Sequence, residues 1–295
     1  MNKKTLNCNG KLICITRPLV MGIVNVTSDS FYDGGRYPTE TDLLKRCENI
    51  IDEGGDIIDV GAVSTRPGAQ DVEFKEEWRR LDKALGVLRK HFPDSIISVD
   101  TFRSDIAQKA VENYSVDIIN DVSGGSFDDR MFETIASLNV PYILTHIQGT
   151  FSTMQENPVY NNLMEELIRY FSERVHRLHR LGVKDVIIDP GFGFGKTITH
   201  NYEILRRLSD LKIFDLPVMV GVSNKSMIYK LLETDARHAT NGTTAVHTLA
   251  LLGGADILRV HEVKEAVECV KIVSNTDTIW NLYSNIDIVS APGSL

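Results

Sequence analysis

The sequence is short of several features that mark whole classes of protein. Only four of its 295 residues are cysteines, and their spacing matches no metal-binding or redox motif. No apolar run approaches the roughly 18–20 residues that a membrane-spanning helix needs. The formal net charge is -8 and no basic stripe is present, so we expect neither nucleic acid nor a membrane as partner. Reduced cysteines and no visible leader segment predict a cytoplasmic protein.

What the chain does have is one repeated pattern, a short apolar run followed by an amphipathic stretch. Runs rich in Val and Ile predict strands buried on both faces of a parallel sheet, at 19–24, 56–60, 96–99, 117–122, 142–147, 185–188, 217–222 and 257–260. Helical periodicity is found at 40–53, 73–91, 104–113, 160–181 and 243–252. Eight such repeats favour a closed (β/α)8 TIM barrel over an open α/β sheet.

The first residues follow a different pattern. Asn9 and Gly10 are flanked by apolar residues, which is a strong signal for a two-residue β-hairpin turn. We therefore predict an N-terminal β-hairpin over residues 1–16 that caps the barrel. The barrel is expected to span residues 17–289 as one domain, because no linker divides it, and residues 290–295 are expected to form a loose tail.

Polar side chains stand at the predicted carboxyl ends of the strands, where barrels of this kind place their chemistry. They include Asn25, Asp59, Asp100, Asn120, His146, Asp189, Lys225 and Arg259. Any one of them alone is more often a helix cap or a solvated residue than a functional group. Capping does not explain why cations and carboxylates converge on one end of eight strands, so we predict a binding site there.

The residue types indicate the chemistry of the ligand. A positive region is expected from Arg66, Lys225, Arg259 and His261, and it would suit an anion. Acceptors on Asn120 and Asp189 would suit a planar edge with two N–H donors. The predicted ligand thus has an anionic end and a donor-bearing heterocycle. A nucleotide-binding loop at 191–197 is a poor match, because Pro190 stands where that motif needs its first glycine.

Seven segments together resemble the dihydropteroate synthase family of pterin-binding TIM barrels. They are residues 21–31, 59–69, 98–101, 119–125, 189–196, 225–226 and 259–261. The resemblance covers nearly the whole chain and keeps the segments in order. It implies a transferase of folate biosynthesis and a sulfonamide target. The implied reaction condenses 6-hydroxymethyl-7,8-dihydropterin pyrophosphate with p-aminobenzoate to give 7,8-dihydropteroate and pyrophosphate, assisted by Mg²⁺. It also implies a homodimer.

The resemblance also implies a role for individual residues. The pterin would be held by Asp100, Asn120, Asp189 and Lys225, and the pyrophosphate by Arg259 and His261, with Asn25 taking part in Mg²⁺ binding. Asp100, Lys225, Arg259 and His261 would carry the catalysis. Two loops would close over the site with Phe31, Asp33, Thr65, Arg66 and Pro67, and the p-aminobenzoate pocket would be lined by Phe194 and Ser226.

The chain departs from the family pattern at Asn224, where an Arg is common, and also at Ile147 and Met227. None of these removes a residue to which the resemblance assigns chemistry. Two other hypotheses stay open at this point. One is a methyltetrahydrofolate–corrinoid methyltransferase, another kind of pterin-binding barrel. The other is a paralogue that binds a pterin but does not catalyse a reaction.

Overall fold

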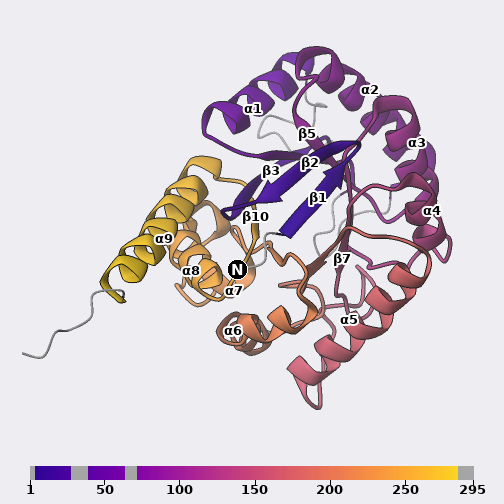
Figure 1. Cartoon of the computed structure of the whole chain (residues 1–295). Coiled ribbons are helices and arrows are strands. Elements are labelled where there is room, and N and C mark those ends of the chain that lie inside the picture. The colour runs from indigo at the N-terminus through magenta and orange to yellow at the C-terminus, as the bar shows by residue number, and fades with distance from the viewer. Residues whose placement is uncertain (1–3, 28–38, 64–71, 285–295) are drawn as a thin grey trace, which may run out of the picture.

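The computed structural model describes residues 4–27, 39–63 and 72–284, and side chains up to residue 276. Its centre is a parallel sheet of eight strands that curls into a barrel (Figure 1). The strands are β3 (Leu19–Asn25), β4 (Ile57–Gly61), β5 (Ile96–Asp100), β6 (Ile118–Asp121), β7 (Tyr142–Thr145), β8 (Val186–Asp189), β9 (Met219–Val220) and β10 (Ile257–Val260).

Helices follow the strands and surround the sheet (Figure 1). The α-helices are α1 (Glu40–Asp52), α2 (Phe74–His91), α3 (Ser104–Tyr114), α4 (Met131–Leu138), α5 (Leu163–Arg180), α6 (Ile198–Arg206), α7 (Ser226–Tyr229), α8 (Thr240–Leu252) and α9 (Val263–Ser284). Two 3-10 helices are η1 (Leu208–Phe214) and η2 (Ala236–His238). Among the described residues, none of these helices has the length and apolarity needed to cross a bilayer.

The barrel closes between the two edge strands of the sheet. The order of the sheet is β8-β7-β6-β5-β4-β3-β10-β9, and an isolated parallel bridge between Ile188 and Val218 joins the two edges. Ile188 donates its backbone N–H to the carbonyl oxygen of Pro217 at 2.9 Å. The predicted (β/α)8 barrel is therefore confirmed.

Strand β9 is shorter than the sequence predicts. Pro217 has no N–H to give to a neighbouring strand. The N–H of Val218 donates instead to the Asp256 carboxylate at 2.9 Å. With both donors lost, regular pairing begins only at Met219. The other seven predicted strands agree with the structure to within two residues at each end.

The predicted hairpin is also confirmed, as β1 (Lys4–Cys8) paired antiparallel with β2 (Lys11–Ile15). Its turn residues Asn9 and Gly10 both have positive φ, at 50° and 85°, which is the geometry of the tight turn that suits two twisted strands. Figure 1 shows the hairpin lying across one end of the barrel. The predicted start of the hairpin, the predicted end of the barrel and the predicted tail fall within residues 1–3 and 285–295, which lie outside the described residues.

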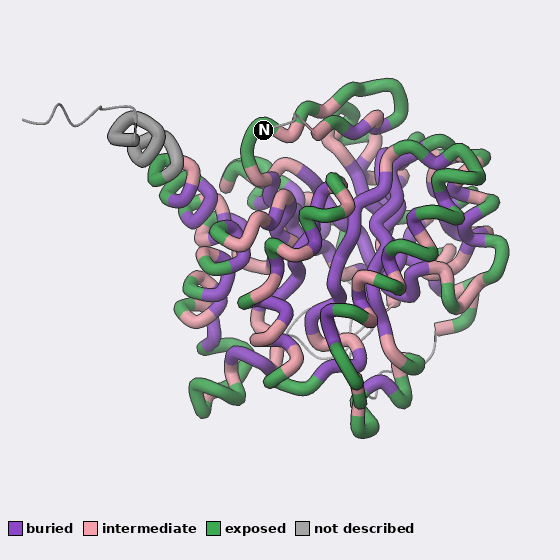
Figure 2. Tube along the Cα trace, turned by 60° about the horizontal axis from the view of Figure 1, so that its bottom comes forward, coloured by how far each residue is buried: buried purple, intermediate pink, exposed green. Residues whose placement is uncertain are grey.

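Packing explains why the hairpin lies there. Two hairpin residues, Leu6 and Cys8, are fully buried against an apolar layer inside the barrel, which we call the floor. Besides the hairpin it consists of Leu19, Met21, Ile57, Ile118, Ile143, Ile187, Met219 and Ile257. A second, larger apolar layer fills the space between the strands and the helices, and Figure 2 shows long buried stretches of the chain inside the molecule. The floor closes the amino-terminal end of the barrel.

The floor predicts a difference between two hairpin leucines. Leu6→Ala removes a side chain with no exposed surface, so it should lower the free energy of unfolding by about 3 kcal/mol. Leu12→Ala is the matched control because Leu12 is 68% exposed, and it should cost less than about 0.5 kcal/mol. Urea unfolding measures both changes. Equal effects of the two substitutions would contradict the packing of the hairpin on the floor.

Candidate active site

A ring of eight residues, six of them polar, lies directly above the floor. Each member stands at the next inward-facing position along its strand. Side chains two residues apart on a strand point the same way, so the ring follows from the floor by a step of two. Its members, which we call the polar ring, are Ile23, Asp59, Ser98, Asn120, Thr145, Asp189, Gly221 and Arg259. Five of the eight are buried polar residues and a sixth is the half-buried Arg259. The inside of the barrel thus changes from mainly apolar to mainly polar over two residues along the strands.

The side chain of Arg259 extends across the inside of the barrel and binds two carboxylates. Its Nε donates to Asp59 at 2.7 Å and one terminal nitrogen donates to Asp100 at 2.6 Å. Burial raises the pKa of Asp100 to about 7 even though Arg259 acts to lower it. Burial alone would lower the pKa of Arg259, but the two carboxylates outweigh it, so the guanidinium stays charged.

One half of the polar ring presents buried polar atoms that bond to nothing among the described residues. They are Asp59 Oδ1, Ser98 Oγ, Asn120 Oδ1 and Thr145 Oγ1, on the four consecutive strands β4 to β7. Buried polar atoms without a partner cost free energy and are rare in folded proteins. Because two of the four are pure acceptors, a ligand that satisfies them must bring hydrogen-bond donors.

Asp189 and Lys225 form the neighbouring part of the site. Burial raises the pKa of Asp189, and Lys225 acts against this. Burial lowers the pKa of Lys225 to about 8. The Lys225 ammonium donates to the carbonyl oxygen of Phe192 and lies 4.7 Å from the ring centre of Phe194. A carboxylate, an ammonium and an aromatic wall therefore meet beyond the ends of β8 and β9.

The turn after β8 has no room for a side chain on its first glycine. Gly191 has a φ of 69°, and a Cβ there would collide with the carbonyl oxygen of His146. Lys196 ends the turn, and its buried Nζ lies 2.9 Å from His146 Nδ1 and 3.0 Å from the carbonyl oxygen of Phe194. The loops after β7 and β8 are thereby locked together, and Phe194 is held in place.

His261 is held by a network behind it. Ser223 Oγ lies 2.9 Å from Glu262 and 3.1 Å from His261 Nδ1. Since the carboxylate takes the hydroxyl hydrogen, we assign the ring proton to Nδ1, which then donates to Ser223.

Asn224 belongs to the same network. Its side chain donates to Glu262 at 2.7 Å, and its φ of 54° is one that Asn tolerates better than most residues. The sequence indicated only that a positive charge is missing here. The structure adds that Asn224 anchors the loop between β9 and α7 to the residue that follows His261.

Asn25 is the residue that the sequence assigns to Mg²⁺. It is half-buried at the carboxyl end of β3, and the space between it and Asp100 is left open by Gly61, where a Cβ would lie 3.7 Å from Asn25 Oδ1. Within the described residues no group of three or more His, Cys, Asp or Glu could hold a metal. A single amide oxygen fits Mg²⁺ only when phosphate oxygens and water complete the shell.

The structure brings most of the predicted site residues to one end of the barrel. Asp100 and Arg259 are in direct contact, Asp59 joins Arg259 to Asn120, and Lys225 contacts Phe194. His261 stands in the separate Ser223 network, and Ser226 is the half-buried first residue of α7. Five predicted residues lie outside the described ranges: Phe31, Asp33, Thr65, Arg66 and Pro67.

Ser98 and Thr145 of the polar ring were not predicted as site residues, and Asp59 was placed at the end of its strand without a role. The signal that could have found them is a polar residue two positions after a floor residue, as Thr145 follows Ile143. Such a signal needs the inward face of each strand to be known. A run of residues buried on both faces does not reveal that face.

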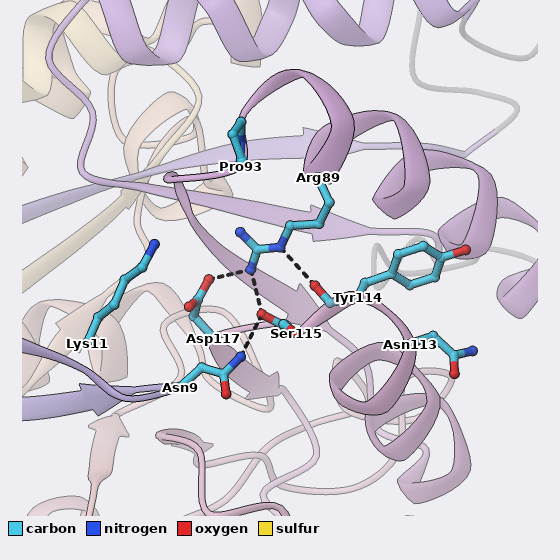
Figure 3. A pocket seen from close by; sticks show the side chains of 8 residues that line it. All are labelled: Asn9, Lys11, Arg89, Pro93, Asn113, Tyr114, Ser115 and Asp117. Carbon is cyan, nitrogen blue, oxygen red and sulfur yellow. Dashed lines mark hydrogen bonds and ion pairs between the residues drawn. The ribbon is translucent and has the colours of Figure 1, made fainter.

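A cavity of about 420 Å³ opens at the opposite end of the barrel, beside the hairpin turn (Figure 3). Its main cation, Arg89, is already bonded to Asp117 at 2.6 Å and to two backbone carbonyl oxygens there. Asn9 of the turn donates to the carbonyl oxygen of Ser115. These contacts fasten the hairpin to the barrel, and we assign the cavity no chemistry.

The Arg259 contacts predict a stability that depends on pH. Arg259→Met should lower the free energy of unfolding by about 3 kcal/mol at pH 8, because two buried carboxylates lose their partner. A carboxyl whose folded pKa is raised binds more protons than the unfolded chain, so stability falls as pH rises through that pKa. The loss should therefore be smaller at pH 5.5.

Urea unfolding at the two pH values measures this, with Arg169→Met as control because Arg169 forms only an exposed i,i+4 pair with Glu165. A loss for Arg259→Met that is the same at both pH values would argue against the buried carboxylates as its cause.

Comparisons with known proteins agree with this geometry. A family model described as pterin binding enzyme matches residues 21–261. The dihydropteroate synthase of Escherichia coli (strain K12) is 40% identical over 273 residues, which cover 92% of this chain and 96% of that protein. The dihydropteroate synthase of Haemophilus influenzae is 35% identical over 269 residues, covering 90% of this chain and 97% of that protein.

Two solved structures extend the agreement to the fold. The dihydropteroate synthase of Yersinia pestis with a sulfonamide drug has a TM-score of 0.88 and 37% identity, and the match covers 93% of this chain and 100% of that chain. The enzyme of Thermus thermophilus in complex with 4-aminobenzoate has a TM-score of 0.82 and 32% identity, covering 92% and 99%. This chain therefore belongs to the pterin binding enzyme family, in the group formed by the dihydropteroate synthases.

Proposed function

We propose that this chain is a dihydropteroate synthase, a transferase that condenses 6-hydroxymethyl-7,8-dihydropterin pyrophosphate with p-aminobenzoate. The observation that carries the proposal is the divided polar ring. One half offers unpartnered polar atoms to a donor-bearing heterocycle, and the other half holds the cation Arg259, with Lys225 beyond it, for an anion. The names of the relatives and the sulfonamide bound in the Yersinia pestis structure point to the same reaction.

The pterin would enter the ring with its donor edge toward Asn120 and Asp189. Asn120 Oδ1 is buried without a partner and can accept one N–H. Asp189 is buried beside Lys225, so a second donor would meet a carboxylate whose charge that ammonium partly balances. Phe194 and Ser226 would border the second substrate, p-aminobenzoate, above the pterin.

The pyrophosphate would meet Arg259 and His261. Within the described residues, the guanidinium spends one N–H on Asp59 and one on Asp100, out of five, so donors remain for an anion. His261 would lie beside it. Mg²⁺, held by Asn25 and by the pyrophosphate itself, would neutralise charge on the leaving group. What supports this assignment is the amide oxygen of Asn25, half-buried at the carboxyl end of β3.

Asp100 would stabilise the positive charge that appears on the pterin methylene when pyrophosphate leaves. A buried carboxylate close to a developing cation lowers its energy more than one in water would. The neutral amine of p-aminobenzoate then attacks that carbon, and the arylammonium that forms is a strong acid that loses its proton to water or to pyrophosphate, so no strong base is required. No described nucleophile is paired with a base in the polar ring, which agrees with this route.

The two other hypotheses are less well supported. A corrinoid methyltransferase would not need Arg259 and His261 beside a pterin site, and the relatives from Escherichia coli and Haemophilus influenzae, at 40% and 35% identity, are dihydropteroate synthases. A silent paralogue is expected to have lost Asn25, Asp100, Arg259 or His261, and all four are present.

The function is tested by supplying both substrates and Mg²⁺ and measuring pyrophosphate and dihydropteroate. We expect equal amounts of the two products, and competition between a sulfonamide and p-aminobenzoate. Methyl transfer to a corrinoid without pyrophosphate release would establish the first rival. Pterin binding without turnover in a folded protein would establish the second.

The pH dependence of kcat/KM for the pterin substrate follows from two pKa values. Asp100, near 7, must be ionised, so the rate should fall as pH drops below about 7. Lys225, near 8, must be protonated, so the rate should fall again above about 8. The profile should be bell-shaped, and Asp100→Asn should be slower and lose the acid limb. A wild-type acid limb in that variant would assign it to another group.

We further propose that the chain forms a homodimer through the outward face of α8. Ala245, Leu249 and Leu252 are exposed there at positions i, i+4 and i+7, which makes an apolar stripe. Two such stripes can cover each other about a two-fold axis. A cytoplasmic location stays a prediction from the sequence.

Leu249→Glu should convert the dimer into a monomer, because it puts two carboxylates into the paired stripes. Light scattering coupled to gel filtration measures the mass, and Ile213→Glu is the control because Ile213 is 73% exposed on η1. A wild-type protein that is monomeric, or a Leu249→Glu variant that stays dimeric, would rule out this interface.

A further inference from the structure

Thr145 occupies a place in the polar ring to which no role has been assigned. It is the last residue of β7, and β7 lies between β6 and β8. Asn120 stands on β6, and Asp189 on β8 is the direct register partner of Thr145. The two residues that would hold the pterin edge are therefore on the strands that flank Thr145.

The side chain of Thr145 faces the inside of the barrel. Ile143, two residues earlier, is part of the floor, and Leu144 between them packs in the outer apolar layer. Alternation along the strand turns Thr145 inward again. Its methyl group is close to Gly191, where a Cβ would lie 3.3 Å from it. The methyl thus packs against backbone of the β8 turn, and the hydroxyl is the polar end of the side chain.

The hydroxyl is buried and has no partner. Thr145 is 1% exposed, and its Oγ1 forms no hydrogen bond with any described residue. Its own carbonyl oxygen, by contrast, accepts from Tyr170 at 2.8 Å. An unsatisfied hydroxyl in this position destabilises the folded chain. Asn120 Oδ1, on the neighbouring strand β6, has no partner either. A single bound molecule that reached both atoms would satisfy both.

We infer that the Thr145 hydroxyl forms a hydrogen bond with the pterin ring, between the contacts of Asn120 and Asp189, and so helps the site to select this heterocycle. The inference rests on the proposed function, because that function names the ligand. A hydroxyl can both donate and accept, so it can pair with a ring atom that Asn120 and Asp189, as acceptors, cannot satisfy. Thr145 then helps to select the pterin substrate and has no role in the binding of p-aminobenzoate.

The test uses Thr145→Val, which keeps the shape and removes the hydroxyl, and Thr145→Ser, which keeps the hydroxyl. Calorimetry measures the binding of 6-hydroxymethyl-7,8-dihydropterin pyrophosphate in the absence of p-aminobenzoate. Thr145→Val should bind about tenfold more weakly than wild type, as expected for one lost hydrogen bond to a buried group, and Thr145→Ser should stay within about twofold. The KM for p-aminobenzoate should not change in either variant.

Stability separates this role from a structural one. Thr145→Val removes a buried polar group that has no partner among the described residues, so its melting temperature without ligand should be no lower than that of wild type. A substitution that damaged packing would lower both the melting temperature and the affinity. The expected result is weaker binding in a protein that is at least as stable.

Three results would overturn the inference: wild-type affinity in Thr145→Val, an equal loss in Thr145→Ser, or a loss of affinity that follows a loss of stability. If Thr145→Val does not fold, Thr145→Ala compared with Thr145→Ser isolates the same hydroxyl, and equal affinities would count against it. Failure of the proposed function is seen separately, because the wild-type chain would then release no pyrophosphate when given both substrates and Mg²⁺, whatever the affinities of the Thr145 variants.

Discussion

The bonds from Arg259 to Asp59 and Asp100 are the constraint on which the candidate site depends. They join β10 to β4 and β5 across the inside of the barrel. None of the three charges could be buried alone, since each would cost several kcal/mol of desolvation. Together they allow a charged centre to sit one step above an apolar floor. The groups that would handle substrate charge are therefore also the groups that hold the open end of the barrel in shape.

This arrangement divides the inside of the barrel into two levels. The floor supplies apolar burial, and the polar ring supplies hydrogen-bonding groups, several of them without partners among the described residues. A protein gains stability from the first and loses some through the second. The locked loops after β7 and β8 add rigidity where the ring is least satisfied, because Lys196 ties His146 to the turn that carries Phe194. Rigid support of this kind keeps unpartnered groups from finding partners within the protein.

Much of the fold could be predicted from the sequence because its signals are local. Continuous Val and Ile runs indicated the strands, and Asn9-Gly10 indicated the hairpin. The pairing of Arg259 with Asp59 could not be predicted, because 200 residues separate them and each has an ordinary role available nearby. The hydrogen bond from Asn224 to Glu262 could not be predicted for the same reason. Thr145 was missed because the run of buried residues around it does not reveal which face of the strand points into the barrel.

The hairpin has a consequence for how the chain is assembled during synthesis. Leu6 and Cys8 precede Met219 and Ile257, which help to bury them, by more than 200 residues, so they leave the ribosome well before those partners. The hairpin can form its turn early, since that turn is local, but it cannot dock until β9 and β10 are present. Closure of the barrel and burial of its first strands are thus a single late event. Until then the apolar side of the hairpin is exposed on the nascent chain.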